Sequence, residues 1–348
     1  MEYEHQVQPM ASDGASLLNN IPQSCNMIER LMPEIRLLIL GFLDLTRLQA
    51  IIRASPIFYQ QYVHYQQNVL LQSFINTLGP IFVDAYTLHL ARKHKGNSSV
   101  DITQFLKTYK VNTARKRVEF TESLSLTCEE ITDMILFRLR FVQPFVDVFA
   151  KRTRKVLNAL VGRETRAFRL SDAERMRFDR AAYRFQLLGQ IASPRTGFGR
   201  RPRREDVSDF ARALEPREVE ELLSAYEFVC EGYSVMLLWY ENRHSERGMA
   251  YDLNDEGEFT YDIGCFVMMD TKSEWDVEEW YSYLEGSALL GLPFFHDAVA
   301  TVVDRNNYNR ANGLGVFPRM ERSFIPILTR VRDVLMVTGM VCLTPGLL

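Results

Sequence analysis

The segment Asp252–Glu258 has the residue spacing that comes nearest to a metal-binding motif. Its sequence, DLNDEGE, puts oxygen-bearing side chains at loop positions 1, 3 and 5 and a glycine at position 6, as in a calcium-binding EF-hand loop. Position 12 of such a loop is a glutamate that supplies two oxygens, whereas this chain has Ile263 there. Because that ligand is missing, we expect an acidic turn in water, with no metal and no cofactor.

Histidines and cysteines could also do chemistry, but their spacing predicts none. The 6 histidines form no HExxH pattern, and His89 and His94 are too far out of phase to share a helix face. The 5 cysteines form no CxxC pair, and their odd number argues against a secreted disulfide framework. Serine nucleophile elbows, P-loops and dinucleotide fingerprints are absent from the sequence. We therefore predict that the protein is not an enzyme.

The composition is that of a globular protein. Of the 348 residues, 47% are apolar and 24% are charged, which excludes a collagen-like or mostly disordered chain. The first 24 residues lack the basic and then apolar pattern of a signal peptide, and apolar runs stay far below the ~18 residues of a membrane span. We expect a cytoplasmic or nuclear protein, or one found in both compartments.

Charge is strongly segregated along the chain. Residues 88–204 carry a net charge of +15 and residues 205–348 one of −15. The two blocks either face each other inside one fold, or each faces an outside partner. Aromatic residues of the basic block fall at core spacing rather than beside the arginines, so nucleic acid is the weaker interpretation. Residues 193–206 hold the densest arginine run, with glycine and proline, and predict an exposed loop.

Helix signals dominate the rest of the sequence. Pro33 suits the first position of a helix to about Leu43, and Ser55-Pro56 predicts a helix start that leads to Gly79-Pro80. Capping boxes begin at Thr127 and Ser171, and Glu215-Pro216 opens another helix. Residues 248–271 are the one weakly β-like stretch, and further helices are expected from Ser273 and over 325–337. With no alternation of strands and helices, the fold class is mainly α.

The helix from Pro33 is apolar on two sides. At about 100° per residue, one face carries Ile35, Leu38, Ile39, Phe42 and Leu43, which would suffice to pack a small helical unit. The opposite side carries Leu37 and Leu40. A small unit cannot easily bury a helix all round, so we expect Leu37 and Leu40 to contact either a partner or the rest of the chain.

These residues carry a family resemblance. Leu31-Met32-Pro33-Glu34-Ile35, followed by Ile39, Leu43-Asp44-Leu45, Leu48 and Ser55, resembles an F-box, which usually opens with Leu-Pro-x-Glu-Ile. Here Met32 stands at the customary proline position and Pro33 follows it. Segments further along resemble the divergent F-box proteins of filamentous fungi: Leu78-Gly79-Pro80, residues 180–187 (RAAYRFQL), residues 214–222 (LEPREVEEL) and residues 290–294 (LGLPF).

The resemblance implies a fold and a function. An N-terminal three-helix F-box-like unit at 27–79 would follow a disordered segment at 1–26 and precede an irregular helical domain at 80–348. Such a protein recruits a substrate, here unknown, to a cullin–RING ubiquitin ligase through a small cullin-linking adaptor. The predicted contact residues are Leu31, Met32, Pro33 and Glu34, which belong to the F-box-like opening, together with Leu37 and Leu40, which helix periodicity adds. The alternative is a non-enzymatic interaction or scaffold protein whose degenerate F-box joins no ligase.

Overall fold

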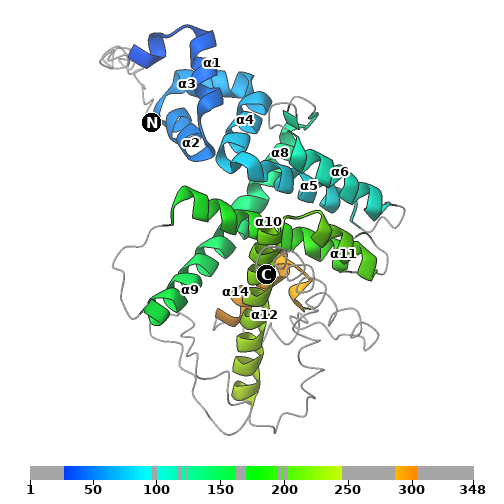
Figure 1. The fold of residues 1–348 in the computed structure, drawn as a ribbon. Helices are drawn as coiled ribbons and strands as arrows, with labels where there is room; N and C mark the ends of the chain where they lie inside the picture. Colours follow the sequence, from blue (N-terminus) through cyan, green and yellow to red (C-terminus); the bar gives the residue numbers. More distant parts are fainter. Residues whose placement is uncertain are drawn as a thin grey trace, which may run out of the picture. The chain divides into compact units, whose positions relative to one another are not determined.

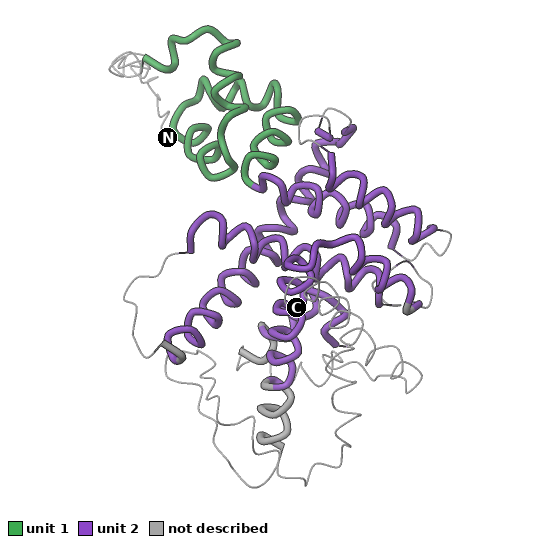
Figure 2. The backbone as a smooth tube through the Cα atoms, in the orientation of Figure 1, with its two compact units in different colours: residues 1–77 green, residues 78–348 purple. Residues whose placement is uncertain are grey.

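The computed structural model describes residues 27–95, 100–115, 120–121, 124–161, 170–193, 198, 203–244 and 287–303. All regular elements within these ranges are helical, which confirms the mainly α fold (Figure 1). The chain divides into two compact units, residues 1–77 and residues 78–348 (Figure 2). In the described part of the chain, no helix combines the length and apolarity needed to cross a membrane.

Several sequence predictions lie outside the described residues. They are the disordered segment at 1–26, the acidic loop at 252–258, the β-like stretch at 248–271, and the helices expected from Ser273 and over 325–337.

Unit 1 consists of short helices, of which α2 and α3 begin with a side-chain N-cap. A 3₁₀ turn, η1 (Met27–Arg30), leads into α1 (Pro33–Phe42), α2 (Leu45–Ala54), α3 (Pro56–His64) and α4 (Gln66–Leu78). The carboxylate of Asp44 accepts a hydrogen bond from the Arg47 amide at 2.8 Å, and the Ser55 hydroxyl accepts from the Phe58 amide at 3.4 Å. These bonds satisfy amide donors that a helix start leaves unpaired. The single helix expected after Ser55 is divided in two near Tyr65.

The core of unit 1 shows which side of α1 faces inward. Leu40 is 0% exposed and packs with Leu48, Phe58 and Val69, while Leu37 is partly buried against the same cluster. Leu38 and Phe42 are 54% and 75% exposed. The expectation that Leu37 and Leu40 lie on the free side of α1 is therefore wrong. When a helix is apolar all round, periodicity locates its two faces but does not select the buried one.

Unit 2 is built around one central helix. It contains the 3₁₀ turn η2 (Gly79–Ile81) and the helices α5 (Phe82–Lys93), α6 (Ile102–Ala114), α8 (Cys128–Phe137), α9 (Gln143–Val161), α10 (Asp172–Ala192), α11 (Arg204–Arg212), α12 (Pro216–His244) and α14 (Leu292–Val303). Helix α10 contacts α5, α9, α11, α12 and α14 (Figure 1). Every residue from Ala181 to Ala192 on α10 is buried, as expected for a helix that neighbours enclose on all sides.

Capping and proline effects explain the local structure of unit 2. Both predicted capping boxes are present, Thr127 with Glu130 at the start of α8 and Ser171 with Glu174 at the start of α10. Pro144 within this helical pattern predicts a kink. The structure has a π-helical turn, η3 (Arg138–Val142), just before it, and the helix continues as α9. Proline has no amide hydrogen to give to the preceding turn, so the wider turn accommodates it.

The predicted exposed loop at 193–206 is wrong at Ser193, Phe198 and Asp206, which are buried, whereas Arg203 is exposed as predicted. Ser193 and Phe198 are buried, and Phe198 makes an edge-to-face contact with Phe105. Helix α11 begins at Arg204, and the buried Asp206 accepts a hydrogen bond from the Arg203 amide at 2.9 Å. The arginine-rich composition gives no indication that Phe198 packs against Phe105 or that Asp206 accepts a hydrogen bond at the start of α11.

Candidate functional site

The exposed side of α1 carries a row of large apolar side chains. Ile35, Leu38 and Phe42, which we call the α1 stripe, are all exposed and fall within about 60° of one another on the helix. Leu31 and Met32 are also exposed at the entrance to the helix. Soluble proteins seldom leave a contiguous apolar row in water unless a partner covers it. The α1 stripe is therefore the candidate interaction site in unit 1.

The start of α1 is held in place by two side chains of the α3 segment. The hydroxyl of Ser55 donates to the carboxylate of Glu29 in η1, and the side-chain amide of Gln61 donates to the carbonyl of Pro33. Ser55 also caps α3 through its hydroxyl oxygen. These bonds fix the direction of the chain where Leu31 and Met32 enter the helix. The α1 stripe is thus presented by a positioned helix start rather than by a loop.

The six predicted contact residues do not form one surface. Leu31, Met32, Pro33 and Glu34 are exposed at the start of α1, whereas Leu37 is half-buried and Leu40 fully buried in the core. Sequence reasoning assigned Ile35, Leu38 and Phe42 to the core instead. The signal that could have separated the two faces is the packing of α2 and α3, which the sequence of α1 does not contain.

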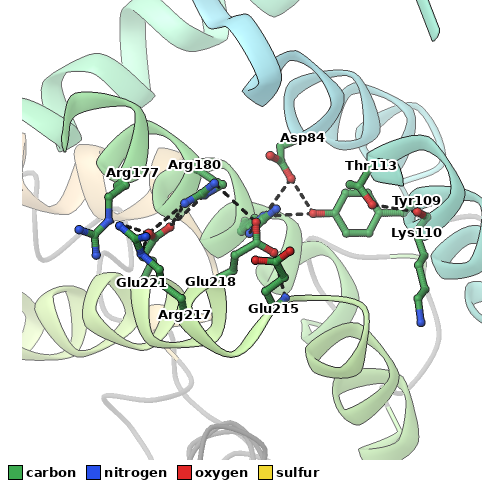
Figure 3. Close-up of polar contacts among 11 residues, drawn as sticks. Asp84, Tyr109, Lys110, Thr113, Arg177, Arg180, Glu215, Arg217, Glu218 and Glu221 are labelled. Carbon is green, nitrogen blue, oxygen red and sulfur yellow. Dashed lines mark hydrogen bonds and ion pairs between the residues drawn. The ribbon is translucent and has the colours of Figure 1, made fainter. Parts of the chain in front are cut away.

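A buried ionic network ties three helices of unit 2 to α10. We call Asp84, Tyr109, Arg184 and Glu218 the Arg184 network (Figure 3). Nε of Arg184 donates to the Asp84 carboxylate at 3.0 Å and to the Tyr109 hydroxyl at 3.1 Å, and Nη1 lies 2.9 Å from the Glu218 carboxylate. The Tyr109 hydroxyl donates to Asp84 at 2.6 Å. These residues belong to α5, α6, α10 and α12, so one guanidinium group fixes four helices.

The surroundings set the protonation states in this network. Burial disfavours the charged form of Arg184. The electrostatic attraction of Asp84, Tyr109 and Glu218 favours that form by more, so the pKa of Arg184 is raised. Burial, with a further contribution from Asp84, raises the pKa of Tyr109 well above its usual value. Arg184 is therefore charged and Tyr109 neutral at any physiological pH. A network this deeply buried meets no solvent-borne substrate, and its role is to position helices.

A second buried pair lies near the first. Nη2 of Arg138, in the π-helical turn η3, donates to the Asp179 carboxylate of α10 at 3.1 Å. Burial raises the pKa of Tyr183, which also lies close to Arg138. The wider π turn places the Arg138 side chain against α10, where it forms an ion pair with the Asp179 carboxylate. Like the Arg184 network, this pair orients helices.

Three arginines converge on one carboxylate where α10 meets α12. We call Arg177, Arg180, Arg217 and Glu221 the Glu221 cluster (Figure 3). The Glu221 carboxylate is almost fully buried. It accepts hydrogen bonds from Nε and Nη2 of Arg180 at 2.7–2.9 Å and from Nε of Arg177 at 2.7 Å. Nε of Arg217 lies 3.8 Å from the same carboxylate. Arg177 and Arg217 remain 46% and 66% exposed.

These contacts show that the two charge blocks meet inside unit 2. Arginines of the basic block pair with glutamates of the acidic block, namely Arg152 with Glu231, Arg177 and Arg180 with Glu221, and Arg184 with Glu218. Some charges of the two blocks therefore pair inside the fold, which is one of the two alternatives that the segregated charge left open. Within the described residues, no group of three His, Cys, Asp or Glu side chains is placed to hold a metal.

A late turn docks on the central helix through a glycine. Gly291 has φ +86°, and a Cβ atom there would lie 2.5 Å from the Gln186 side chain of α10. The same Gln186 oxygen accepts a hydrogen bond from the Leu292 amide at 2.6 Å. The LGLPF segment at 290–294 therefore requires glycine for two reasons, a left-handed backbone and a close approach. This turn is a packing element rather than a binding site.

Comparisons with known proteins give no match. No family model matches the chain, and neither a curated protein nor a solved structure is significantly similar to it.

Proposed function

We propose that this protein is an F-box-type adaptor that brings a protein substrate to a cullin–RING ubiquitin ligase. One observation carries the proposal: an exposed apolar row, Ile35, Leu38 and Phe42, directly follows the Leu-Met-Pro-Glu sequence that resembles an F-box opening. In this proposal unit 1 contacts the small cullin-linking adaptor, and unit 2 holds the substrate.

The physical form of the α1 stripe supports a protein partner. An amphipathic helix that lays three or four apolar side chains into a groove is a common recognition mode, and the spacing 31, 35, 38, 42 is the pattern of such anchors. A short helix positioned by Ser55 and Gln61 loses little conformational entropy on binding. Leu31 and Met32 extend the same apolar surface at the helix start.

The alternative is an interaction protein that joins no ligase. Met32 at the customary proline position favours this alternative, because the opening residues of an F-box belong to the family's contact surface. The α1 stripe would then bind a different protein. Both functions require the stripe to be exposed, and they differ in which partner covers it.

Affinity purification of the tagged full-length protein from its source cells distinguishes the two. The adaptor function predicts that the small cullin-linking protein and a cullin co-purify with the wild-type chain and are lost with Leu38→Lys/Phe42→Lys. If neither subunit is recovered with a folded wild-type chain, the adaptor function is wrong. Recovery of other proteins that also depend on Leu38 and Phe42 would establish the alternative.

A further inference from the structure

The Glu221 cluster holds more cationic donor groups than its single carboxylate uses. Each guanidinium has five N–H donors in a planar fork. The two oxygens of Glu221 already accept hydrogen bonds from Nε and Nη2 of Arg180 and from Nε of Arg177, and Nε of Arg217 lies 3.8 Å away. Both exposed arginines therefore turn Nε toward Glu221, and the opposite edge of each guanidinium, formed by its two Nη groups, is left for another partner.

Nearby acidic side chains are engaged elsewhere. Glu174, whose carboxylate interacts with Arg177 at longer range, accepts hydrogen bonds from the hydroxyl and the amide of Ser171 at 2.7 and 2.8 Å. Glu218 lies 2.9 Å from the buried Arg184 and 3.5 Å from Arg180. Among the described residues, the hydrogen bonds and ion pairs of Arg177 and Arg217 reach no carboxylate besides Glu221.

We propose that the exposed forks of Arg177 and Arg217 bind two neighbouring carboxylates of an acidic protein segment. A fork of two parallel N–H groups matches the two oxygens of a carboxylate, so each arginine can take one acidic side chain. Arg180 holds the Glu221 carboxylate, which in turn hydrogen-bonds Arg177 and lies within ion-pair distance of Arg217, so both guanidinium groups are restrained before binding and less entropy is lost on binding. The partner is thus a segment with at least two Asp or Glu residues close together.

This surface lies wholly within unit 2, so its test is independent of the adaptor function of unit 1. If the adaptor proposal fails and this one holds, the acidic segment belongs to a partner outside any ligase. If the adaptor proposal holds, the acidic segment belongs to the recruited substrate. The measurement uses the purified full-length chain with no cullin-linking protein present, so the two failures are distinguishable.

The test is a fluorescence-anisotropy titration with a labelled peptide that contains Glu-Glu pairs, at physiological ionic strength. A peptide with Gln at the same positions and a single-stranded DNA of equal charge serve as comparison probes. We expect the Glu peptide to bind and the Gln peptide not to bind. Arg177→Ala/Arg217→Ala should weaken Glu-peptide binding by about tenfold or more, since two bidentate contacts to charged groups are lost.

Arg203→Ala/Arg212→Ala is the matched control. These two arginines lie at the two ends of α11 in the same unit, are 62% and 67% exposed, and pair with Asp206 and Asp209, so their loss removes the same two charges from a different place. A melting curve for each variant establishes that it is folded. Equal binding by Arg177→Ala/Arg217→Ala and Arg203→Ala/Arg212→Ala would overturn the proposal, as would failure of the Glu peptide to bind the wild type. Binding of the DNA alone would assign the surface to a different class of partner and overturn it as well.

Discussion

Replacing Leu40 with alanine tests which side of α1 is the inner one. Leu40 is 0% exposed and touches the core formed by Leu48, Phe58 and Val69. Truncation at such a site removes buried methyl groups and leaves a cavity, which costs about 3–5 kcal/mol. A unit of this size has little stability to spare, so we expect Leu40→Ala to unfold unit 1 or bring it close to unfolding.

Leu38→Ala is the matched control, because it makes the same chemical change two residues earlier on the opposite face. Leu38 is 54% exposed, and its truncation should alter stability by no more than about 0.5 kcal/mol. Hydrogen exchange of the α1–α3 amides in the full-length protein measures unit 1 separately from unit 2. If Leu38→Ala loses protection and Leu40→Ala keeps it, the assignment of the two faces of α1 is reversed and the α1 stripe is not a surface.

Three further predictions concern unit 2. Asp84→Asn should lower the free energy of unfolding by about 3–5 kcal/mol in urea titrations, because it breaks a buried ion pair and leaves the charge of Arg184 only partly neutralised. An unchanged urea midpoint would contradict the role given to the Arg184 network. Gly291→Ala should destabilise the protein by about 1–3 kcal/mol because of the φ of +86° and the close approach to Gln186. The control is Gly41→Ala in α1 of unit 1, where the nearest neighbour of an added Cβ is 3.9 Å away; it should cost nothing or stabilise α1 by up to about 1 kcal/mol. Equal effects of the two substitutions in thermal melts would refute the packing argument. Hydrogen bonds from the Thr127 amide and from Lys93 lower the pKa of Glu130 from 4.5 to about 2. This carboxylate therefore stabilises the fold above pH 4.5, and its contribution is lost as the pH falls toward 2. Glu130→Gln should flatten that part of the acid-unfolding curve, and a curve parallel to that of the wild type would show that the carboxylate contributes nothing.

Local signals in the sequence predicted helix starts well. The capping boxes at Thr127 and Ser171 and the proline at Pro33 are decided by neighbours within a few residues, so the sequence alone contains the necessary information. The mainly α fold follows from the same signals.

Long-range contacts could not be predicted in this way. In the sequence, Arg184 stands out only within the segment 180–187 that carries the family resemblance, because its partners Asp84 and Tyr109 lie 100 and 75 residues away. For a related reason, Ile35, Leu38 and Phe42 were wrongly assigned to the buried side of α1, whereas Ile39 and Leu43 pack against the core as expected. The helix is apolar on both sides, and the choice between them is made by α2 and α3, which cover Leu40 and leave Phe42 in water.

A binding titration with purified components tests the central claim most directly. The small cullin-linking adaptor protein is titrated against the full-length wild type, against Leu38→Lys/Phe42→Lys, and against Leu136→Lys/Leu139→Lys, which changes another exposed apolar pair, in unit 2. Placing two lysines in an apolar interface costs several kcal/mol, enough to abolish an affinity in the micromolar range. The account predicts binding by the wild type and the unit 2 variant and none by the folded Leu38→Lys/Phe42→Lys protein. Undiminished binding by that variant, or no binding by the folded wild type, would contradict it.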